Sequence, residues 1–227
     1  MKKILLLAML LVFSFAVHAQ KDVTKFLGIP IDGTKSEMIK KLKEKGFTES
    51  VLGDDVLEGE FNGVDVYIYI GTNNNKVWRI AVADAYPRDE TNIRIRFNKL
   101  CSQFERNKKY FEANINSSAY IDYTIPDDED ISYEMKVNKK RYEALYTQLP
   151  DSAFVAQQLL SRYEKSRWDS IPPKLQESLF NLEKSAQTVI ASINKSVWFT
   201  ISEHPLGEYF IIMYYDNEYN RAQGEDL

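Results

Sequence analysis

Apolar and polar residues alternate over three neighbouring stretches of the chain between residues 56 and 86. Two polar segments separate these stretches, Asn62-Gly63 and the run from Gly71 to Lys76. Asn-Gly is typical of a two-residue hairpin turn, because both residues readily adopt the positive φ angles that such a turn requires. The pattern therefore predicts three antiparallel strands in a meander.

Successive side chains of a strand point to opposite faces of the sheet, so the alternation also predicts what each face carries. One face of the meander is apolar. The other face presents Tyr67, Tyr69 and Arg79, with Ala81 and Ala83 beside them. The apolar face carries Val64, Val66, Ile68, Ile70, Trp78, Ile80 and Val82.

A helix is expected on each side of the meander. Thr34 and Glu37 form a capping box, which satisfies free backbone N–H groups at a helix start. Apolar residues then recur at helical spacing as far as Gly46, a residue that commonly ends a helix. A second apolar stripe follows Pro87 and ends before Asn107, which predicts another helix. Its apolar positions are Ile93, Phe97, Leu100 and Phe104.

The second half of the chain has a different order of elements. Helical spacing predicts two helices, at residues 152–168 and 175–194, with Pro172-Pro173 between them. The segment 141–149 fits either a strand or a helix, and the strand is favoured. Four further strands are expected, at residues 119–125, 131–137, 197–202 and 209–215.

Together these elements predict an α+β fold, with antiparallel sheets and helices packed on one sheet face. The chain length suits one large domain or two small ones. We expect an α-β-β-β-α module at residues 24–115 and a second α+β module at residues 116–216. A polar tail at residues 217–227 follows them.

Residues 1–19 have the features of a secretory signal peptide. A positively charged start precedes the apolar run Ile4 to Val17, and the segment ends in a small residue, Ala19. The apolar run is shorter than the roughly 20 residues that span a bilayer. No cysteine follows the cleavage position, so no lipid anchor is expected. The sequence predicts a periplasmic or secreted protein without a membrane anchor, beginning near Gln20.

The net charge and the rare residue types limit which partners and metal sites this chain can have. The formal net charge of −4 becomes −6 when Lys2 and Lys3 leave with the signal peptide. Nucleic-acid binders carry a basic patch, so this acidity argues against a nucleic-acid partner. His204 is the only histidine outside the signal peptide, and Cys101 is the only cysteine. A zinc site needs more such ligands, and His204 and Cys101 are expected in a solvated turn and in the core.

The acidic run Asp127, Asp128, Glu129 and Asp130 is the best candidate for a metal site. Calcium takes six to eight oxygen ligands, and an acidic turn between strands would supply some of them. The EF-hand spacing is missing, however, and a solvated acidic turn is the favoured interpretation. There is no P-loop and no Rossmann glycine pattern, so no cofactor is expected. Paired carboxylates leave a hydrolase or a glycan-active enzyme as the alternative function.

The segment from Phe26 to Met38 reads FLGIPIDGTKSEM. It resembles the opening of exported Bacteroidetes proteins of unknown function, in which a FLGIP-DG-KSEM lead precedes a helix and a β-meander. The resemblance covers residues 24–86. It implies an envelope or secreted protein and assigns no functional residue.

The sequence favours a non-enzymatic binding module that uses a sheet face. Tyrosine, tryptophan and arginine dominate binding hot spots, because they combine a large contact area with a polar group. The expected partner is a protein, a peptide or a glycan. In the alternative interpretation the two hairpins pack face to face and these aromatic residues belong to the core. The candidate binding residues are Tyr67, Tyr69, Arg79, Trp198 and Tyr214.

Overall fold

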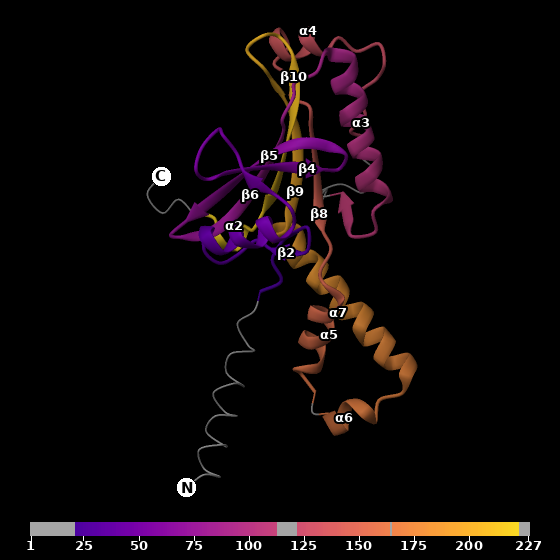
Figure 1. The fold of residues 1–227 in the computed structure, drawn as a ribbon. Coiled ribbons are helices and arrows are strands. Elements are labelled where there is room, and N and C mark those ends of the chain that lie inside the picture. Colours follow the sequence, from indigo (N-terminus) through magenta and orange to yellow (C-terminus); the bar gives the residue numbers. More distant parts are fainter. Residues whose placement is uncertain (1–20, 113–121, 164, 223–227) are drawn as a thin grey trace.

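The computed structural model describes residues 21–112, 122–163 and 165–222. Its main feature is an antiparallel sheet of eight strands, in the order β3-β4-β5-β6-β10-β9-β8-β7. Strands β4 to β6 lie across the view of Figure 1 and β8 to β10 run upright, so the sheet is strongly twisted. The strands are β3 (Thr48–Glu49), β4 (Val56–Phe61), β5 (Val64–Asn73), β6 (Lys76–Asp84), β7 (Tyr110–Glu112), β8 (Glu143–Gln148), β9 (Ser196–Glu203) and β10 (Tyr209–Asp216).

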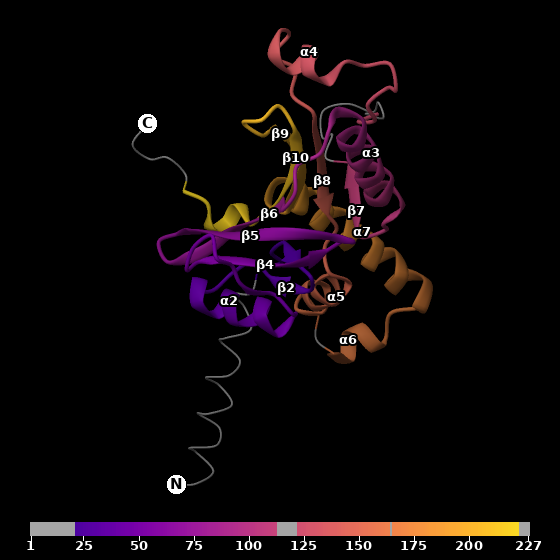
Figure 2. The ribbon, with the colours of Figure 1, turned by 45° about the horizontal axis from the view of Figure 1, so that its top comes forward.

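The helices cover one face of this sheet and extend beyond one of its ends. Helices α2 and α3 pack on the face that contains the core, which confirms the predicted α+β class with antiparallel strands. An arm formed by α5, α6 and α7 projects from the sheet in both ribbon views (Figures 1 and 2). A short hairpin, β1 (Lys25–Phe26) and β2 (Ile29–Pro30), precedes α2. The helices are α2 (Lys35–Glu44), α3 (Glu90–Arg106), α4 (Ile131–Lys136), α5 (Ser152–Leu160), α6 (Lys165–Asp169), α7 (Pro173–Asn194) and the 3-10 turn η2 (Glu218–Asn220).

The predicted meander forms strands β4, β5 and β6. Asn62 and Gly63 have φ angles of 55° and 75°, as the hairpin signal required. The second turn is tighter than the polar run suggested, because Asn74 and Asn75 alone connect the strands, with φ angles of 47° and 60°. A change of register at Gly71 accompanies this turn.

The core lies between the inner face of the sheet and helices α2 and α3. Phe97 and Phe104 of α3 reach β9 and β8, and the Phe97 ring meets Phe199 with 5.0 Å between ring centroids. Phe104 stacks on Tyr146 at 4.6 Å. The capping box of α2 is present, and Met38 is one of the residues that this helix buries. The apolar stripes of both helices were therefore correct predictions of buried faces.

The two halves of the chain share one sheet. Strand β6 pairs with β10 over five residue pairs, from Arg79 opposite Asp216 to Ala83 opposite Ile212. The two hairpins consequently lie edge to edge, and the interpretation in which they pack face to face is wrong. A single cluster of buried residues includes side chains from both proposed modules.

Three sequence predictions in the second half need correction. Residues 131–137 were expected as a strand but form helix α4, whose first turn is capped by the Asp130 carboxylate at 2.7 Å from the Tyr133 amide. Residues 122–125 are not in a strand, and residues 119–121 lie outside the described part. The predicted helix 152–168 is divided into α5 and α6, whereas the favoured strand at 141–149 is confirmed as β8.

Helix α7 is confirmed, but most of its apolar side chains face solvent. Leu182 and Ile193 are 68% and 64% exposed. Its buried residues are Ala191 and Glu183, and the Glu183 carboxylate is paired with Arg162 at 2.8 Å. No helix in the described ranges is both long enough and apolar enough to cross a bilayer.

Candidate functional site

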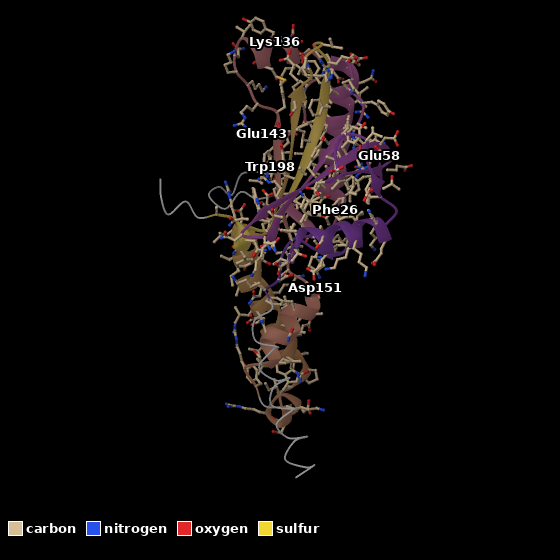
Figure 3. All side chains as sticks on the ribbon, turned by 60° about the vertical axis from the view of Figure 1, so that its left-hand side comes forward. Phe26, Glu58, Lys136, Glu143, Asp151 and Trp198 are labelled. Carbon is tan, nitrogen blue, oxygen red and sulfur yellow. The ribbon has the colours of Figure 1, made fainter. Side chains whose placement is uncertain are left out.

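The five candidate residues lie on the same face of the sheet, opposite to α2 and α3. Tyr69 and Tyr214 both pair with Ala81, and Tyr214 also pairs with Trp198. Directly paired residues of antiparallel strands point to the same side. We call this side the outer face. In Figure 3, Trp198 and Glu143 project from β9 and β8 on the side away from α3.

Arg79 is the centre of a polar cluster on the outer face. Its guanidinium donates two hydrogen bonds to the Asp216 carboxylate, from Nε at 2.6 Å and from Nη2 at 2.7 Å. Trp198 donates a third, from Nε1 to Oδ2 of Asp216 at 3.0 Å. Asp216 is 1% exposed, so its charge is balanced by Arg79 rather than by water.

Planar side chains pack closely around this ion pair. The rings of Trp198 and Tyr214 are nearly parallel, with centroids 4.2 Å apart. The Arg79 guanidinium carbon lies 4.6 Å from the Tyr214 ring and 4.3 Å from the Trp78 ring. We call Trp198, Tyr214, Arg79, Trp78 and Asp216 the aromatic ladder. Trp78 was expected on the apolar face, but it is half-buried here and contacts Arg79.

The ladder and the two remaining tyrosines differ in exposure. Tyr69 is 42% exposed, while Tyr67, Trp198 and Tyr214 are half-buried. Burial raises the pKa of Tyr214 above its ordinary value, although the Arg79 charge acts in the opposite direction. Tyr214 therefore stays a neutral phenol in the physiological range. Ala81 of β6 lies between Tyr69 of β5 and Tyr214 of β10, and its small side chain leaves space between the two tyrosines.

The acidic run Asp127 to Asp130 lies in the loop before α4 rather than in a turn between strands. Glu129 accepts hydrogen bonds from the Lys140 ammonium and the Tyr142 hydroxyl. Burial acts to raise the pKa of Glu129, but these two hydrogen bonds, together with the charges of Lys140 and Arg94, outweigh it and the pKa is lowered. Among the described residues, no group of three or more His, Cys, Asp or Glu side chains is placed to hold a metal ion.

The two rare residues take no part in the outer face. Cys101 is buried in α3, and burial raises the pKa of its thiol to about 12. His204 lies in the turn between β9 and β10, where its Nδ1 accepts a hydrogen bond from the Leu206 amide at 3.5 Å. The only cysteine and the only histidine of the described residues therefore lie on separate elements, α3 and the β9–β10 turn.

Sequence reasoning did not find two members of the ladder, Asp216 and Trp78. The signal for Asp216 was available, because it is two residues from Tyr214 in the same strand and therefore on the same face. Its partner Arg79 is 137 positions away, and the pairing of β6 with β10 brings them together. No local pattern identifies such a pairing.

Fold and site together define an α+β protein with an antiparallel sheet, helices on its inner face, and an outer face that carries aromatic side chains around the Arg79–Asp216 ion pair. Comparison of the chain with family models, with curated proteins and with solved structures produced no match.

Proposed function

We propose that this chain is an exported, non-enzymatic binding protein that holds a protein or peptide partner on its outer face. The observation that carries the proposal is the aromatic ladder together with Tyr67 and Tyr69, on a face against which neither α2 nor α3 packs. Side chains fixed by stacking and ion pairing lose little entropy when a partner binds. Tyrosine, tryptophan and arginine are also the residue types that contribute most to protein interfaces.

The geometry favours a protein or peptide over a glycan. A sugar ring typically stacks on a free aromatic face, but the Tyr214 ring already stacks on Trp198, and the Arg79 guanidinium carbon lies 4.6 Å from the Tyr214 ring and 5.5 Å from the Trp198 ring. The ladder thus presents aromatic rings together with an ion pair and a phenol hydroxyl. Such a mixture suits the apolar and hydrogen-bonding contacts of a protein interface.

Export rests on the predicted signal peptide and on the resemblance of residues 24–86 to exported Bacteroidetes proteins. The mature protein should begin at Gln20 and act in the periplasm or outside the cell. Intact-mass measurement of the protein from its native host tests this, and retention of Met1 would contradict it.

The binding proposal is tested with an immobilised chain that begins at Gln20. A partner captured from an envelope fraction is purified, and its affinity is measured for the wild type, Tyr69→Ala and Tyr67→Ala. We expect each variant to bind at least tenfold more weakly, since a hot-spot truncation costs about 2 kcal/mol or more. Tyr133→Ala is the control, because Tyr133 is 53% exposed and lies on α4.

Thermal melts of all variants must match the wild type, so that weak binding is not caused by unfolding. Unchanged affinity of both tyrosine variants would refute the proposal. If the outer face binds a soluble glycan but not the purified protein partner, the site belongs to a glycan instead.

A further inference from the structure

A large open cavity lies on the inner side of the sheet, away from the outer face. Its volume is about 1290 Å³, and its walls come from the β1–β2 hairpin, the end of α3 and the segments that begin α5 and follow α7. None of the five outer-face candidates lines it. A site in this cavity would therefore be independent of the proposed function.

The cavity is strongly basic in a chain with a formal net charge of −4. Six lysines and two carboxylates line it. Two of the lysines are neutralised, Lys25 by Asp151 at 2.6 Å and Lys195 by Asp22 at 2.7 Å. The remaining four form no ion pair within the described residues, and only Glu60 opposes them in the lining. These four are Lys45, Lys108, Lys109 and Lys184.

The four lysines come from separate elements around the cavity. Lys45 follows α2, Lys108 and Lys109 follow α3, and Lys184 lies on α7. All four are exposed, so they are hydrated point charges at the mouth rather than a fixed fork. Four such lysines can attract one anionic group without fixing it at a single position.

The floor of the cavity is apolar and aromatic. Phe104, Met213 and Tyr215 belong to the core, and half-buried Phe61 and Tyr110 complete the surface. At the back, Gln148 is fixed by hydrogen bonds to both backbone groups of Lys25 and to the Tyr110 hydroxyl. A polyanion would leave such a floor unused, whereas a hydrocarbon chain would cover it.

We propose that this basic cavity binds a single-chain lipid anion, such as a long-chain fatty acid. The hydrocarbon chain lies on the aromatic floor and the carboxylate lies among the lysines. Pockets for molecules of this kind combine a mostly apolar lining with a few polar groups that fix the orientation.

The test is a fluorescence titration with cis-parinaric acid, followed by displacement with oleate, methyl oleate or poly-L-glutamate. We expect saturable binding, displacement by oleate, and clearly weaker displacement by the uncharged methyl ester. Lys108→Glu/Lys109→Glu should lower the oleate affinity at least tenfold. Higher salt should weaken the wild-type binding, because the lysines are exposed.

The matched control is Lys40→Glu/Lys41→Glu, which changes the net charge equally at two exposed lysines of α2 outside the cavity. Its oleate affinity should stay within twofold of the wild type. If the double variants lose their thermal transition, Leu27→Asn provides a second test. Leu27 is exposed at the cavity with a φ angle of 50°, which asparagine tolerates, and the loss of its apolar surface should weaken oleate severalfold.

Absence of saturable parinarate binding would overturn the proposal, as would equal displacement by oleate and methyl oleate. Equal affinities for the Lys108/Lys109 and Lys40/Lys41 variants would also overturn it. Binding of poly-L-glutamate without binding of oleate would assign the cavity to acidic polymers instead. The outer-face variant Tyr69→Ala should bind oleate normally, so failure of either proposal is distinguishable from failure of the other.

Discussion

Replacement of Asp216 by alanine should destabilise the fold, because it leaves a partly buried guanidinium without its counter-ion. Asp216 is 1% exposed and accepts two hydrogen bonds from Arg79 and one from Trp198. Removal of one member of a buried ion pair costs about 3–5 kcal/mol. The Arg79 side chain keeps 23% of its surface exposed, so part of its charge is recovered by water. We therefore expect a loss near the lower limit, about 3 kcal/mol.

Urea unfolding measures this loss through the shift of the midpoint at constant slope. A double-mutant cycle with Arg79→Met then isolates the pair. Arg79→Met alone leaves a buried carboxylate and should also be costly, whereas the double variant buries no unpaired charge. The two effects should be non-additive by at least about 1 kcal/mol, as for residues in one hydrogen-bonded network.

An Asp216→Ala loss below about 1 kcal/mol, or strict additivity in the cycle, would refute this account of the pair. The aromatic ladder would then not be held by Asp216. It would be a flexible surface, and the outer face would not be preorganised for binding.

Three further predictions concern single residues elsewhere. A hydrogen bond from Lys25 is the main cause that lowers the pKa of Asp151. The ionised Asp151 side chain therefore stabilises the fold at pH values above its unfolded pKa of about 4, and this contribution is lost as the pH falls through the folded pKa. Asp151→Asn, which keeps a helix cap, should lower the melting temperature at pH 7 and less so at pH 3; an equal difference at both pH values would contradict this. Cys101, whose pKa is about 12, should react with a disulfide reagent at pH 8 only after unfolding, and rapid native labelling would count against it. Asp130→Ala should cost about 1 kcal/mol through the lost cap of α4, with Asp130→Asn largely neutral, and no effect of alanine would speak against the cap.

Local patterns predicted the elements whose signals are contained in a few residues. Asn62-Gly63 gave the first hairpin, because the turn geometry demands residues that accept positive φ. Thr34 and Glu37 gave the start of α2 through reciprocal hydrogen bonds to its free amides. In each case the sequence signal and the stabilising contact are the same interaction.

Prediction failed where one pattern fits two structures. Ile131, Tyr133 and Met135 alternate with polar residues, and in so short a segment this alternation favours a strand. The segment forms a helix of 6 residues instead, because Asp130 caps it and Arg94 of α3 binds the preceding loop through the Asp127 and Glu129 carbonyls. That second contact is tertiary, and the local alternation carries no trace of it.

The candidate site was predicted as residue types but not as a structure. Tyr67, Tyr69, Arg79, Trp198 and Tyr214 were placed on outward positions by strand alternation, and they do share a face. What alternation cannot supply is the order of the strands. The stacking that makes the ladder rigid depends on β10 lying between β6 and β9, which is a property of the whole sheet.

The dimensions of the sheet explain why the inner face has a cavity at all. Eight strands at a spacing of about 4.8 Å make a sheet about 34 Å wide. Helices α2 and α3 are each about 10 Å across and together cover about 20 Å of that width. The remaining strip has to be covered by connecting segments, which lack the continuous apolar stripe of a helix. The β1–β2 hairpin and the residues after α3 cover it only in part, and lysines that follow α2 and α3 or lie on α7 surround the part left open. A protein that needed only a stable core would gain by closing this strip with apolar side chains, so the basic rim over an aromatic floor favours a bound anion there over a packing defect.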